Sequence, residues 1–519
     1  MADGINKIVI VGGGSAGWLA AGVIAAEHRV DNERFELVLI ESPDVPTIGV
    51  GEGTWPSMRS TLQRVGITET DFIRECDASF KQGTWFRDWR TGNGDTYSHP
   101  FTVPIDYTDT NLAAHWQALH DAPPFADAVT PQTALFADCL APKQITTPEY
   151  AFVVNYGYHL DAGKFAVLLR KHCTGKLGVR HIEANVSQIN AADNGDIQSV
   201  TTDRAGDVAG DLFIDCTGTK SLLLGEHFGV PFQSQRAYLF NDTALAAQVP
   251  YAEDDQPIQS CTHSTAQTSG WIWDIGLPTR RGTGHVYSSA HISDEEAGDQ
   301  LLAYIREIAG DKAAAGVEPR KIRFEPGHRQ EFWHRNCVAI GMASGFIEPL
   351  EASALVMIEQ AAAMIADQLP PNREVMDIVA ARYNRKFLRH WRQIIEFLKL
   401  HYVLSARDDS PYWRENRAAD SIPEKLGEQL ALWRHRSPWH QDAEAVDDLF
   451  PIPSYQYILY GMDFATAPRQ TVSRGQDQRQ QHAAELFRKN AARAAQLQQA
   501  MPGNRELINK VREFGFQQL

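Results

Sequence analysis

The sequence predicts an α/β fold with a doubly wound core, an added antiparallel sheet and a mainly helical C-terminal part. Three observations predict it. KIVIV at residues 7–11 is a strand-like run followed at once by glycines and helix-forming residues, alternating segments recur near 271–276 and 284–292, and helical patterns prevail beyond residue 375. A strand, a glycine turn, a helix and a second strand make a βαβ unit, from which doubly wound sheets are built.

The N-terminal βαβ unit is the clearest element. After the strand at 7–11, the glycines of GGGSAGW at 12–18 open a helix rich in alanine, and FELVLIE at 35–41 reads as a second buried strand. Gly and Pro then interrupt regular structure, and helices are predicted near 57–66 and 68–76. The doubly wound core is therefore expected to start at the N-terminus.

The middle of the chain is more varied. Many prolines and aromatic residues between about 82 and 150 indicate mixed loops and short strands. A helix is predicted at 161–173, and strands follow in VRHIEANVSQI, around IQSVTTD and in DLFIDCTG at 211–218. A strand at 336–344 then leads into a helix from about 352 to 368, and the polar stretch at 474–500 reads as an amphipathic helix.

Length and composition bound the organisation. A chain of 519 residues exceeds the size at which one compact core usually stops growing, and 43% apolar with 10% aromatic residues is typical of a folded globule. We expect residues 1–370 to form a discontinuous core with sheet insertions near 82–155 and 230–330, and residues 371–519 to form the helical part.

Charge and cysteine usage exclude several classes of protein. The net charge of -16 repels phosphate backbones, and no cluster of basic residues interleaved with aromatics relieves it, so nucleic acid is excluded as a partner. The six cysteines stand singly, so neither a disulfide framework nor a metal site is expected. The chain has no signal-like N-terminus and no apolar run of the ~20 residues that a membrane span requires, which predicts a soluble, cytoplasmic protein.

The glycine motif predicts a dinucleotide site. Gly12, Gly14 and Gly17 form GxGxxG between a strand and a helix, and acidic Glu41 ends the next strand. The glycines permit a tight turn and close approach of a pyrophosphate, and Glu41 can accept from ribose hydroxyls. A glycine turn that binds nothing is the alternative. FAD is favoured over NAD because two later segments, 211–218 and 336–351, each run from an apolar strand into a turn of small residues that could return to the same dinucleotide.

Five motifs together resemble one family. GGGSAGW at 12–18, GVGEGTWPS at 49–57, CDASFK at 76–81, GWIWDIGLP at 270–278 and GFIEPLEASA at 345–354 are similar to motifs of the flavin-dependent tryptophan and indole halogenases. They are spread from residue 7 to about residue 355. The resemblance implies an FAD-binding, GxGxxG-type flavoprotein core with a substrate-side antiparallel sheet.

The resemblance also implies a reaction and its partners. Such enzymes bind reduced FAD supplied by a separate NAD(P)H-dependent flavin reductase and use O2 and halide to form hypohalous acid. This oxidant passes through a tunnel to a second pocket, where a small electron-rich aromatic ring is halogenated. A homodimer is left open. The family's cofactor positions correspond here to Gly12, Gly13, Gly14, Ser15, Ala16, Gly17, Glu41, Ser42, Val45, Ile48, Val50, Gly53, Val186, Met342 and Leu355.

Two residues take the family's catalytic places. Lys81 of CDASFK corresponds to the essential lysine at the end of the tunnel, where an ammonium can activate hypohalous acid or an amine can form a haloamine. A snorkelling surface lysine is the alternative. Glu351 corresponds to the glutamate that stabilises the cationic ring intermediate and takes up its proton, with Glu348 as the competing position. Compensation of a helix N-terminus is the alternative for Glu351.

The halide site departs from the family. The backbone amides of Ser353 and Ala354 occupy the halide-binding positions, at a helix N-terminus suited to anions. Where the family typically has EST followed by glycine, this chain has Glu351, Ala352, Ser353 and Ala354. Ala354 places a methyl group where the family has the hydrogen of glycine, which changes how closely a halide can be held. This leads to the hypothesis that bromide is used better than chloride.

The aromatic substrate is expected to lack an amino-acid group. His99 and Phe101 in YSHPF match the residues that sandwich the indole, with a core histidine as the alternative for His99. The paired tyrosines and downstream glutamate that grip the amino-acid part of tryptophan have no match in the stretch 434–460. Indole or an indole derivative therefore fits better than free tryptophan.

The two tryptophans of GWIWDIGLP are read as structural gatekeepers. Trp271 and Trp273 point the same way in a strand, and core packing alone could account for them. In the family's WxWxIP motif, they are thought to stand between flavin and substrate. An aromatic monooxygenase that hydroxylates its substrate is one competing function; it must bring its substrate to the flavin, whereas a halogenase keeps the two apart. A flavin-binding protein without turnover is the other, and Lys81 and Glu351 speak against it.

Overall fold

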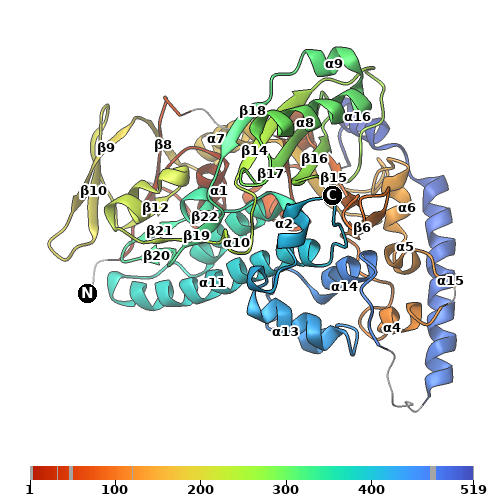
Figure 1. The fold of residues 1–519 in the computed structure, drawn as a ribbon. Helices are drawn as coiled ribbons and strands as arrows, with labels where there is room; N and C mark the ends of the chain where they lie inside the picture. The colour runs from red at the N-terminus through yellow and green to blue at the C-terminus, as the bar shows by residue number, and fades with distance from the viewer. Residues whose placement is uncertain (1–3, 32, 46–50, 120, 468–474, 518–519) are drawn as a thin grey trace. The chain divides into compact units, whose positions relative to one another are not determined.

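The computed structural model describes residues 4–31, 33–45, 51–119, 121–467 and 475–517 (Figure 1). The chain forms two compact units, each assembled from three segments. Unit 1 comprises Met1–Ala78, Leu160–Arg236 and Phe324–Trp391; unit 2 comprises Ser79–His159, Ala237–Arg323 and Arg392–Leu519.

Unit 1 contains the predicted doubly wound core. Its six-stranded sheet has the order β20-β21-β12-β1-β2-β8, and all neighbours are parallel except β20 and β21. The inner strands are buried almost throughout, as expected for a parallel sheet covered on both faces. The strands are β1 Lys7–Val11, β2 Glu36–Glu41, β8 Arg180–Glu183, β12 Leu212–Asp215, β20 Trp333–His334 and β21 Cys337–Ala339.

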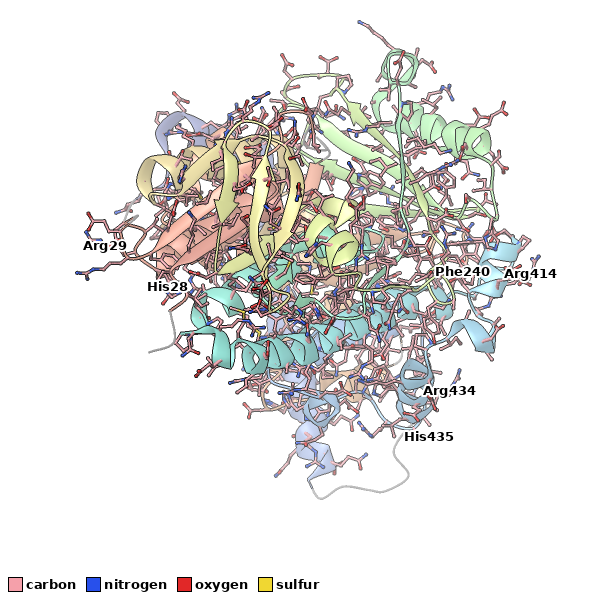
Figure 2. All side chains as sticks on the ribbon, turned by 90° about the vertical axis from the view of Figure 1, so that its left-hand side faces the viewer. His28, Arg29, Phe240, Arg414, Arg434 and His435 are labelled. Atoms are coloured by element: carbon pink, nitrogen blue, oxygen red, sulfur yellow. The ribbon has the colours of Figure 1, made fainter. Side chains whose placement is uncertain are left out.

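Helix α1 (Ser15–Glu27) is the central helix of unit 1. It packs against both α7 (Ala162–Lys176) and α10 (Ser353–Asp367). His28, labelled in Figure 2, follows α1, and its Nε2 lies 2.8 Å from the carbonyl oxygen of Ala366 near the end of α10. The remaining helices and small sheets of unit 1 use α2 Ser57–Val65, α3 Glu69–Glu75, β9 Val186–Ala191, β10 Ile197–Thr202, β11 Gly206–Ala209, β13 Phe232–Ser234, β19 Gly327–Arg329 and β22 Gly345–Phe346.

Unit 2 is organised around a seven-stranded sheet. Its order is β18-β14-β17-β16-β15-β5-β6, antiparallel except for the parallel pair β15 and β5. The strands are β5 Gly83–Arg87, β6 Thr96–Pro100, β14 Thr243–Val249, β15 Thr262–Gln267, β16 Gly270–Gly276, β17 Arg281–Tyr287 and β18 Arg320–Arg323.

The two faces of this sheet differ. One face carries Leu245 and Ile272 and is covered by α8 (Asp294–Ala309), whose Leu301 and Ile305 complete an apolar core. Because strand residues alternate between faces, Trp271 and Trp273 lie on the opposite face, which we call the tryptophan face.

The rest of unit 2 is largely helical. Short helices in the segment 112–137 pack against the long α15, and β4 pairs with the first residues of β7. These elements are β4 Ser79–Lys81, β7 Gly157–Asp161, α4 Leu112–Trp116, α5 Phe125–Val129, α6 Gln132–Ala137, α9 Asp311–Ala315, α11 Arg373–Val403, α12 Pro411–Glu415, α13 Glu424–Trp433, α14 Ile452–Gly461, α15 Gln476–Ala500 and α16 Asn504–Phe514, with α11 shared between the two units. Among the described residues, no helix is long and apolar enough to span a membrane.

The α/β fold class is confirmed, while one element prediction needs correction and one helix was not predicted. The strand expected at 284–292 is β17 at Arg281–Tyr287; the residues after it form a turn, in which the amides of His291 and Ile292 bond back to the Ser288 carbonyl. Helix α8 was not anticipated. Its N-terminus is nevertheless well marked, since the Ser293 hydroxyl accepts from the amide of Glu296.

Candidate active site

The glycine loop joins β1 to α1 in unit 1. A Cβ on Gly12, whose φ is 117°, would lie 2.1 Å from the carbonyl oxygen of Cys216, and a Cβ on Gly17 would lie 1.9 Å from the carbonyl oxygen of Gly12. Both positions therefore need glycine for close packing of strand, loop and helix. A Cβ on Gly14 would meet no protein atom within 4 Å, so the space beside this residue is open.

Glu41 lies against the glycine loop at the end of β2. A Cβ on Gly13 would come 2.3 Å from the Glu41 carboxyl carbon. The carboxylate is half-buried, with His181 Nε2 at 2.9 Å and Arg170 Nη1 at 3.8 Å. An acid held beside the loop in this way is what a ribose of a dinucleotide requires, so these residues fit FAD.

The two later segments return to the glycine loop within unit 1. Cys216, after β12, contacts Gly12, and a Cβ on Gly341, after β21, would lie 2.9 Å from the Cβ of Ala16. Met342 belongs to the short turn at Gly341–Ala343. Both segments that were expected to return to the dinucleotide therefore lie at the glycine loop.

The other predicted cofactor residues are spread over unit 1. Ser42 donates its hydroxyl to the side-chain oxygen of Asn185 at 2.6 Å, which places it beside Val186. Val45 is 70% exposed. The remaining positions are Ser15 in the first turn of α1, Gly53 in β3 (Gly51–Gly53) and Leu355, buried in α10; Ile48 and Val50 lie outside the described residues.

The segment EPLEASA forms a sharp turn before α10. Both Glu348 and Glu351 are buried. Glu351 (φ 66°, ψ 2°) and Ala352 (φ 54°, ψ 45°) are consecutive left-handed residues, and α10 begins directly after them at Ser353. Ser353 is buried and Ala354 exposed. Glu351 therefore stands outside the helix in a conformation that few non-glycine residues adopt.

Lys81 lies in unit 2, on β4. Its exposed fraction is 1%, which contradicts the alternative of a snorkelling surface lysine. Its Nζ lies 5.5 Å from the ring centre of Phe101, within the range of a cation–π contact. Burial, followed by the charge of Lys81, holds the pKa of the neighbouring His159 well below its ordinary value. Lys81 is thus brought together with one of the two predicted substrate residues.

Strand β4 is fixed to its surroundings by hydrogen bonds on both sides of the lysine, one from a side chain and one from the backbone. The Ser79 hydroxyl donates to the carbonyl of Gly276, at the end of the tryptophan strand β16, at 2.5 Å. The amide of Gln82 donates to the carbonyl of Ser260 at 2.7 Å. Lys81 is therefore held on a rigid support, as a functional side chain requires.

His99 lies on the tryptophan face, on β6. It is directly opposite Thr84, while Thr262, the partner of Thr84 on β15, shares the face of Ser264 and hence of Trp273. The imidazole is buried, 5.7 Å from the ring of Phe397. This contact also fits the alternative of a packed core histidine.

Trp271 and Trp273 stand side by side on the tryptophan face. Their ring centres are 6.4 Å apart in an edge-to-face arrangement. Trp271 is buried, whereas Trp273 is partly exposed. A Cβ on Gly284, opposite Trp273 on β17, would lie 2.2 Å from the Trp273 ring. The ring can lie over this position because glycine has no side chain.

Asp274 points to the other face and is a structural residue. It is fully buried, and Arg281 bonds both of its oxygens, with Nε 3.0 Å from Oδ1. The hydroxyl of Tyr304 on α8 donates to it at 3.0 Å. Burial opposes ionisation of Asp274, but the charge of Arg281 outweighs it, so the pKa of the carboxyl lies below its ordinary value.

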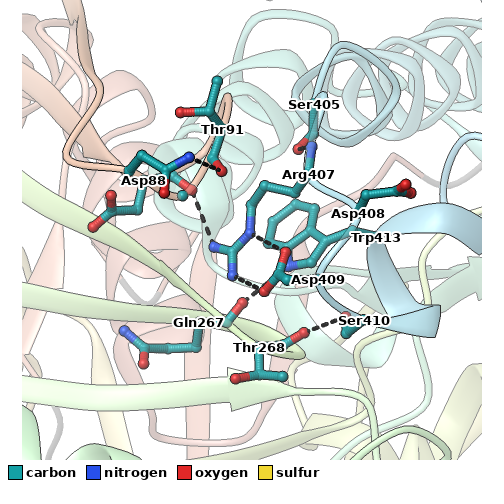
Figure 3. Close-up of polar contacts among 12 residues, drawn as sticks. Asp88, Thr91, Gln267, Thr268, Ser405, Arg407, Asp408, Asp409, Ser410 and Trp413 are labelled. Carbon is teal, nitrogen blue, oxygen red and sulfur yellow. Dashed lines mark hydrogen bonds and ion pairs between the residues drawn. The ribbon is translucent and has the colours of Figure 1, made fainter.

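Figure 3 shows how the hairpin of β15 and β16 is held at its turn. Trp413 donates its indole N–H to the carbonyl of Gln267 at 3.0 Å, and Ser410 donates its hydroxyl to that of Thr268 at 2.6 Å. The buried guanidinium of Arg407 lies 4.7 Å from the ring centre of Trp413. Sequence reasoning missed these residues, because nothing in the pattern of the helical C-terminal part relates them to a strand far away in the chain.

Comparisons with known proteins identify the family to which the chain is similar. The family model described as tryptophan halogenase matches residues 7–478. The crystal structure of a tryptophan halogenase from Shewanella frigidimarina is 52% identical, covers 100% of this chain and 99% of its own, and superposes with a TM-score of 0.95.

Two further relatives are more distant. The tryptophan 6-halogenase SttH from Streptomyces toxytricini is 33% identical over 477 residues, covering 88% of this chain and 89% of its own length. Tar14, a tryptophan C-6 flavin-dependent halogenase (chlorinase) from taromycin biosynthesis, is 32% identical with a TM-score of 0.90, covering 98% of this chain and 100% of its own.

Proposed function

This chain belongs to the tryptophan halogenase family, and from that premise we propose that it halogenates indole or an indole derivative, using reduced FAD, O2 and halide. The observation that carries the proposal is Lys81, a lysine buried to 1% exposure beside the ring of Phe101. Burying an ammonium group costs free energy, so a lysine at a buried position is expected to have a functional role.

Lys81 is proposed to activate the oxidant. Its Nζ can donate a hydrogen bond to hypohalous acid, which makes the halogen more electrophilic, or the neutral amine can carry the halogen. The support for this role is the fixed position of β4 and the nearby aromatic ring of Phe101. An aromatic wall beside the lysine is suited to hold a flat, electron-rich ring by stacking.

Glu351 is proposed to stabilise the cationic ring intermediate and to accept the proton that the ring loses. A carboxylate near developing positive charge lowers its energy, and a buried carboxylate does so more strongly than an exposed one. Glu351 is buried in the left-handed turn before α10. Glu348 is buried as well, so a variant at each position is needed to assign the role.

The glycine loop and Glu41 are the residues that would hold the flavin. Their fit is supported by the open space beside Gly14 and by the acid held against the loop. When bound in its reduced form, FAD supplies the electrons for the reaction of O2 that oxidises halide. A separate NAD(P)H-dependent flavin reductase is proposed to deliver it, and chemically reduced FAD can take its place in an assay.

Free tryptophan is the less suitable substrate for this chain. The relatives are named for tryptophan, but here two tyrosines of α14, Tyr457 and Tyr460, are hydrogen-bonded within unit 2. Tyr457 donates its hydroxyl to the carbonyl of Thr102 at 2.7 Å, and the hydroxyl oxygens of Tyr460 and Thr466 are 3.3 Å apart. Hydroxyls that are already paired are poor candidates for gripping a zwitterion, which supports an indole without the amino-acid group.

The halide is proposed to bind at the amides of Ser353 and Ala354, with bromide used better than chloride. The left-handed Ala352 and the methyl group of Ala354 stand at this helix N-terminus. A larger, more easily oxidised halide tolerates a less closely fitted site.

Product mass tests the proposal. We incubate the protein with FAD, a flavin reductase, NADH, indole and bromide under air and analyse the products by mass spectrometry. Bromoindole is the expected product. Hydroxyindole would instead indicate a monooxygenase, which the halogenase relatives do not favour, and unreacted indole with normal flavin binding would indicate a protein without turnover on this substrate class.

A further inference from the structure

We infer that Trp55 is a positioning residue for Glu351. The indole Nε1–H of Trp55 donates to the backbone carbonyl of Glu351 at 2.7 Å, although the two residues are 296 positions apart in the chain. The inference rests on the role proposed for Glu351: by fixing the backbone of that residue, the indole fixes where its carboxylate points.

The backbone that Trp55 holds is one that alanine and glutamate adopt reluctantly. Glu351 and Ala352 have φ values of 66° and 54°, and a Cβ in this region crowds the following carbonyl. Glycine would adopt it freely, yet neither position has glycine. The turn therefore needs outside contacts to persist, and the bond from Trp55 joins the bond from the Ala352 amide to the Pro349 carbonyl, 2.9 Å long.

Trp55 itself stands on a support that is tied to the same helix. It lies two residues before α2, and the amide of Met58 bonds back to the Trp55 carbonyl at 3.2 Å. From α2, the hydroxyls of Ser57 and Thr61 donate to Glu359 on α10 at 3.2 and 2.5 Å. Trp55 and the start of α10 are thus parts of one hydrogen-bonded frame.

Glu359 shows that the frame is dry where α2 meets α10. The carboxyl is 3% exposed, and burial raises its pKa to about 7 despite the bonds from Thr61 and Ser57. The bond from Trp55 lies at the partly buried end of the same frame, and a hydrogen bond is worth more where less water can replace it. Loss of the indole donor is therefore expected to be felt at Glu351.

The test replaces Trp55 with Phe, which removes the donor and keeps an aromatic ring. With bromide, reduced FAD and indole as the probe, we expect kcat to fall ~10-fold, the size expected for loss of one well-placed hydrogen bond, and KM for indole to stay within ~2-fold. A merely structural role would not separate kcat from KM in this way.

Trp333 offers a matched control. Its indole Nε1–H also donates to the carbonyl of a left-handed residue, Arg335 (φ 52°), at 3.0 Å and also in unit 1. Trp333→Phe removes the same kind of bond outside the segment proposed for catalysis. It is expected to leave kcat unchanged.

Rescue by a second variant addresses the mechanism. Glycine adopts the left-handed conformation without strain, so Ala352→Gly makes the turn less dependent on the bond from Trp55. The double variant Trp55→Phe with Ala352→Gly is therefore expected to recover at least half of the lost kcat. The same cycle is read from thermal unfolding, without any turnover: Ala352→Gly is expected to raise the unfolding temperature more in the Trp55→Phe background than in the wild type.

The outcomes separate this inference from the proposed function. If the wild type gives no haloindole, the proposed function fails, and the unfolding cycle alone decides whether Trp55 and Ala352 are coupled. If the wild type is active, a Trp55→Phe variant with unchanged kcat, or an inactive, folded double variant, overturns the inference. Where Trp55→Phe does not fold, the double variant is expected to fold and work.

Discussion

Replacement of Arg281 with Met tests the physical account of the tryptophan strand most sharply. Arg281 is the partner of Asp274, the residue directly after Trp273, and both members of the pair are buried. The variant keeps the apolar stem of the side chain and leaves a carboxylate without its counter-charge behind the tryptophan face. Removing one partner of a buried ion pair costs about 3–5 kcal/mol.

The loss of stability in Arg281→Met depends on pH in a defined direction. In the wild type, the folded-state pKa of Asp274 lies below the ordinary value of 3.8, so the pair contributes stability above that pH and loses it as the pH falls through the folded-state pKa. Without Arg281, burial instead raises this pKa above the unfolded value. The destabilisation is then complete at high pH and is relieved as the pH falls through the raised pKa.

Thermal unfolding followed by circular dichroism measures both effects. At pH 8, Arg281→Met is expected to unfold at least about 6 °C below the wild type, since 1 kcal/mol corresponds to roughly 2–4 °C in a domain of this kind. At pH 5 the gap is expected to be smaller. Lys510→Met, which removes an exposed pair with Glu506 on α16, is the control and is expected to change little. A gap under about 2 °C at pH 8, or one that widens toward pH 5, would refute the reasoning.

Three further predictions concern the proposed site. Replacing Trp271 or Trp273 with Ala is expected to raise the share of hydrogen peroxide or hydroxylated product, and an unchanged product distribution would make them plain core residues. Bromide is expected to give at least about twice the turnover of chloride at equal concentration; equal or faster chlorination would contradict the halide hypothesis. Gly14→Ala is expected to weaken FAD binding in a fluorescence titration without lowering the unfolding temperature, because its Cβ meets no protein atom, whereas Gly17→Ala should lower both. If Gly14→Ala binds FAD normally, the glycine loop does not approach the cofactor as proposed.

Local sequence patterns predicted the strands and the helix of the N-terminal βαβ unit. KIVIV and FELVLIE form adjacent parallel strands, and Glu41 ends the second one as expected. Two buried strands joined by a glycine turn and a helix can pair in few other ways. The family is confirmed by the match over residues 7–478, and the α/β class is confirmed by the structure and by its solved neighbours. The turn after β17 was misjudged because apolar alternation ran on into it, and helix α8, which begins at Asp294, was not predicted.

Long-range contacts limited what could be predicted of the site. The burial of Lys81 is decided by residues from other segments, such as Phe101, and CDASFK alone leaves it open. The bond from Trp55 to Glu351 joins two motifs that each stand out in the sequence, but whose contact no local pattern indicates. The left-handed turn at Glu351 could not be predicted either, since glycine usually marks such turns in a sequence and neither Glu351 nor Ala352 is glycine.

The central claim is that Lys81 enables halogenation of an aromatic ring by a family member that binds reduced flavin. The most direct measurement compares the wild type with Lys81→Met in the product-mass assay with indole, bromide and reduced FAD, while FAD binding is measured in parallel. We predict bromoindole from the wild type, at least ~100-fold less from Lys81→Met, and equal flavin affinity for both. Bromoindole formed by Lys81→Met at the wild-type rate would contradict the claim.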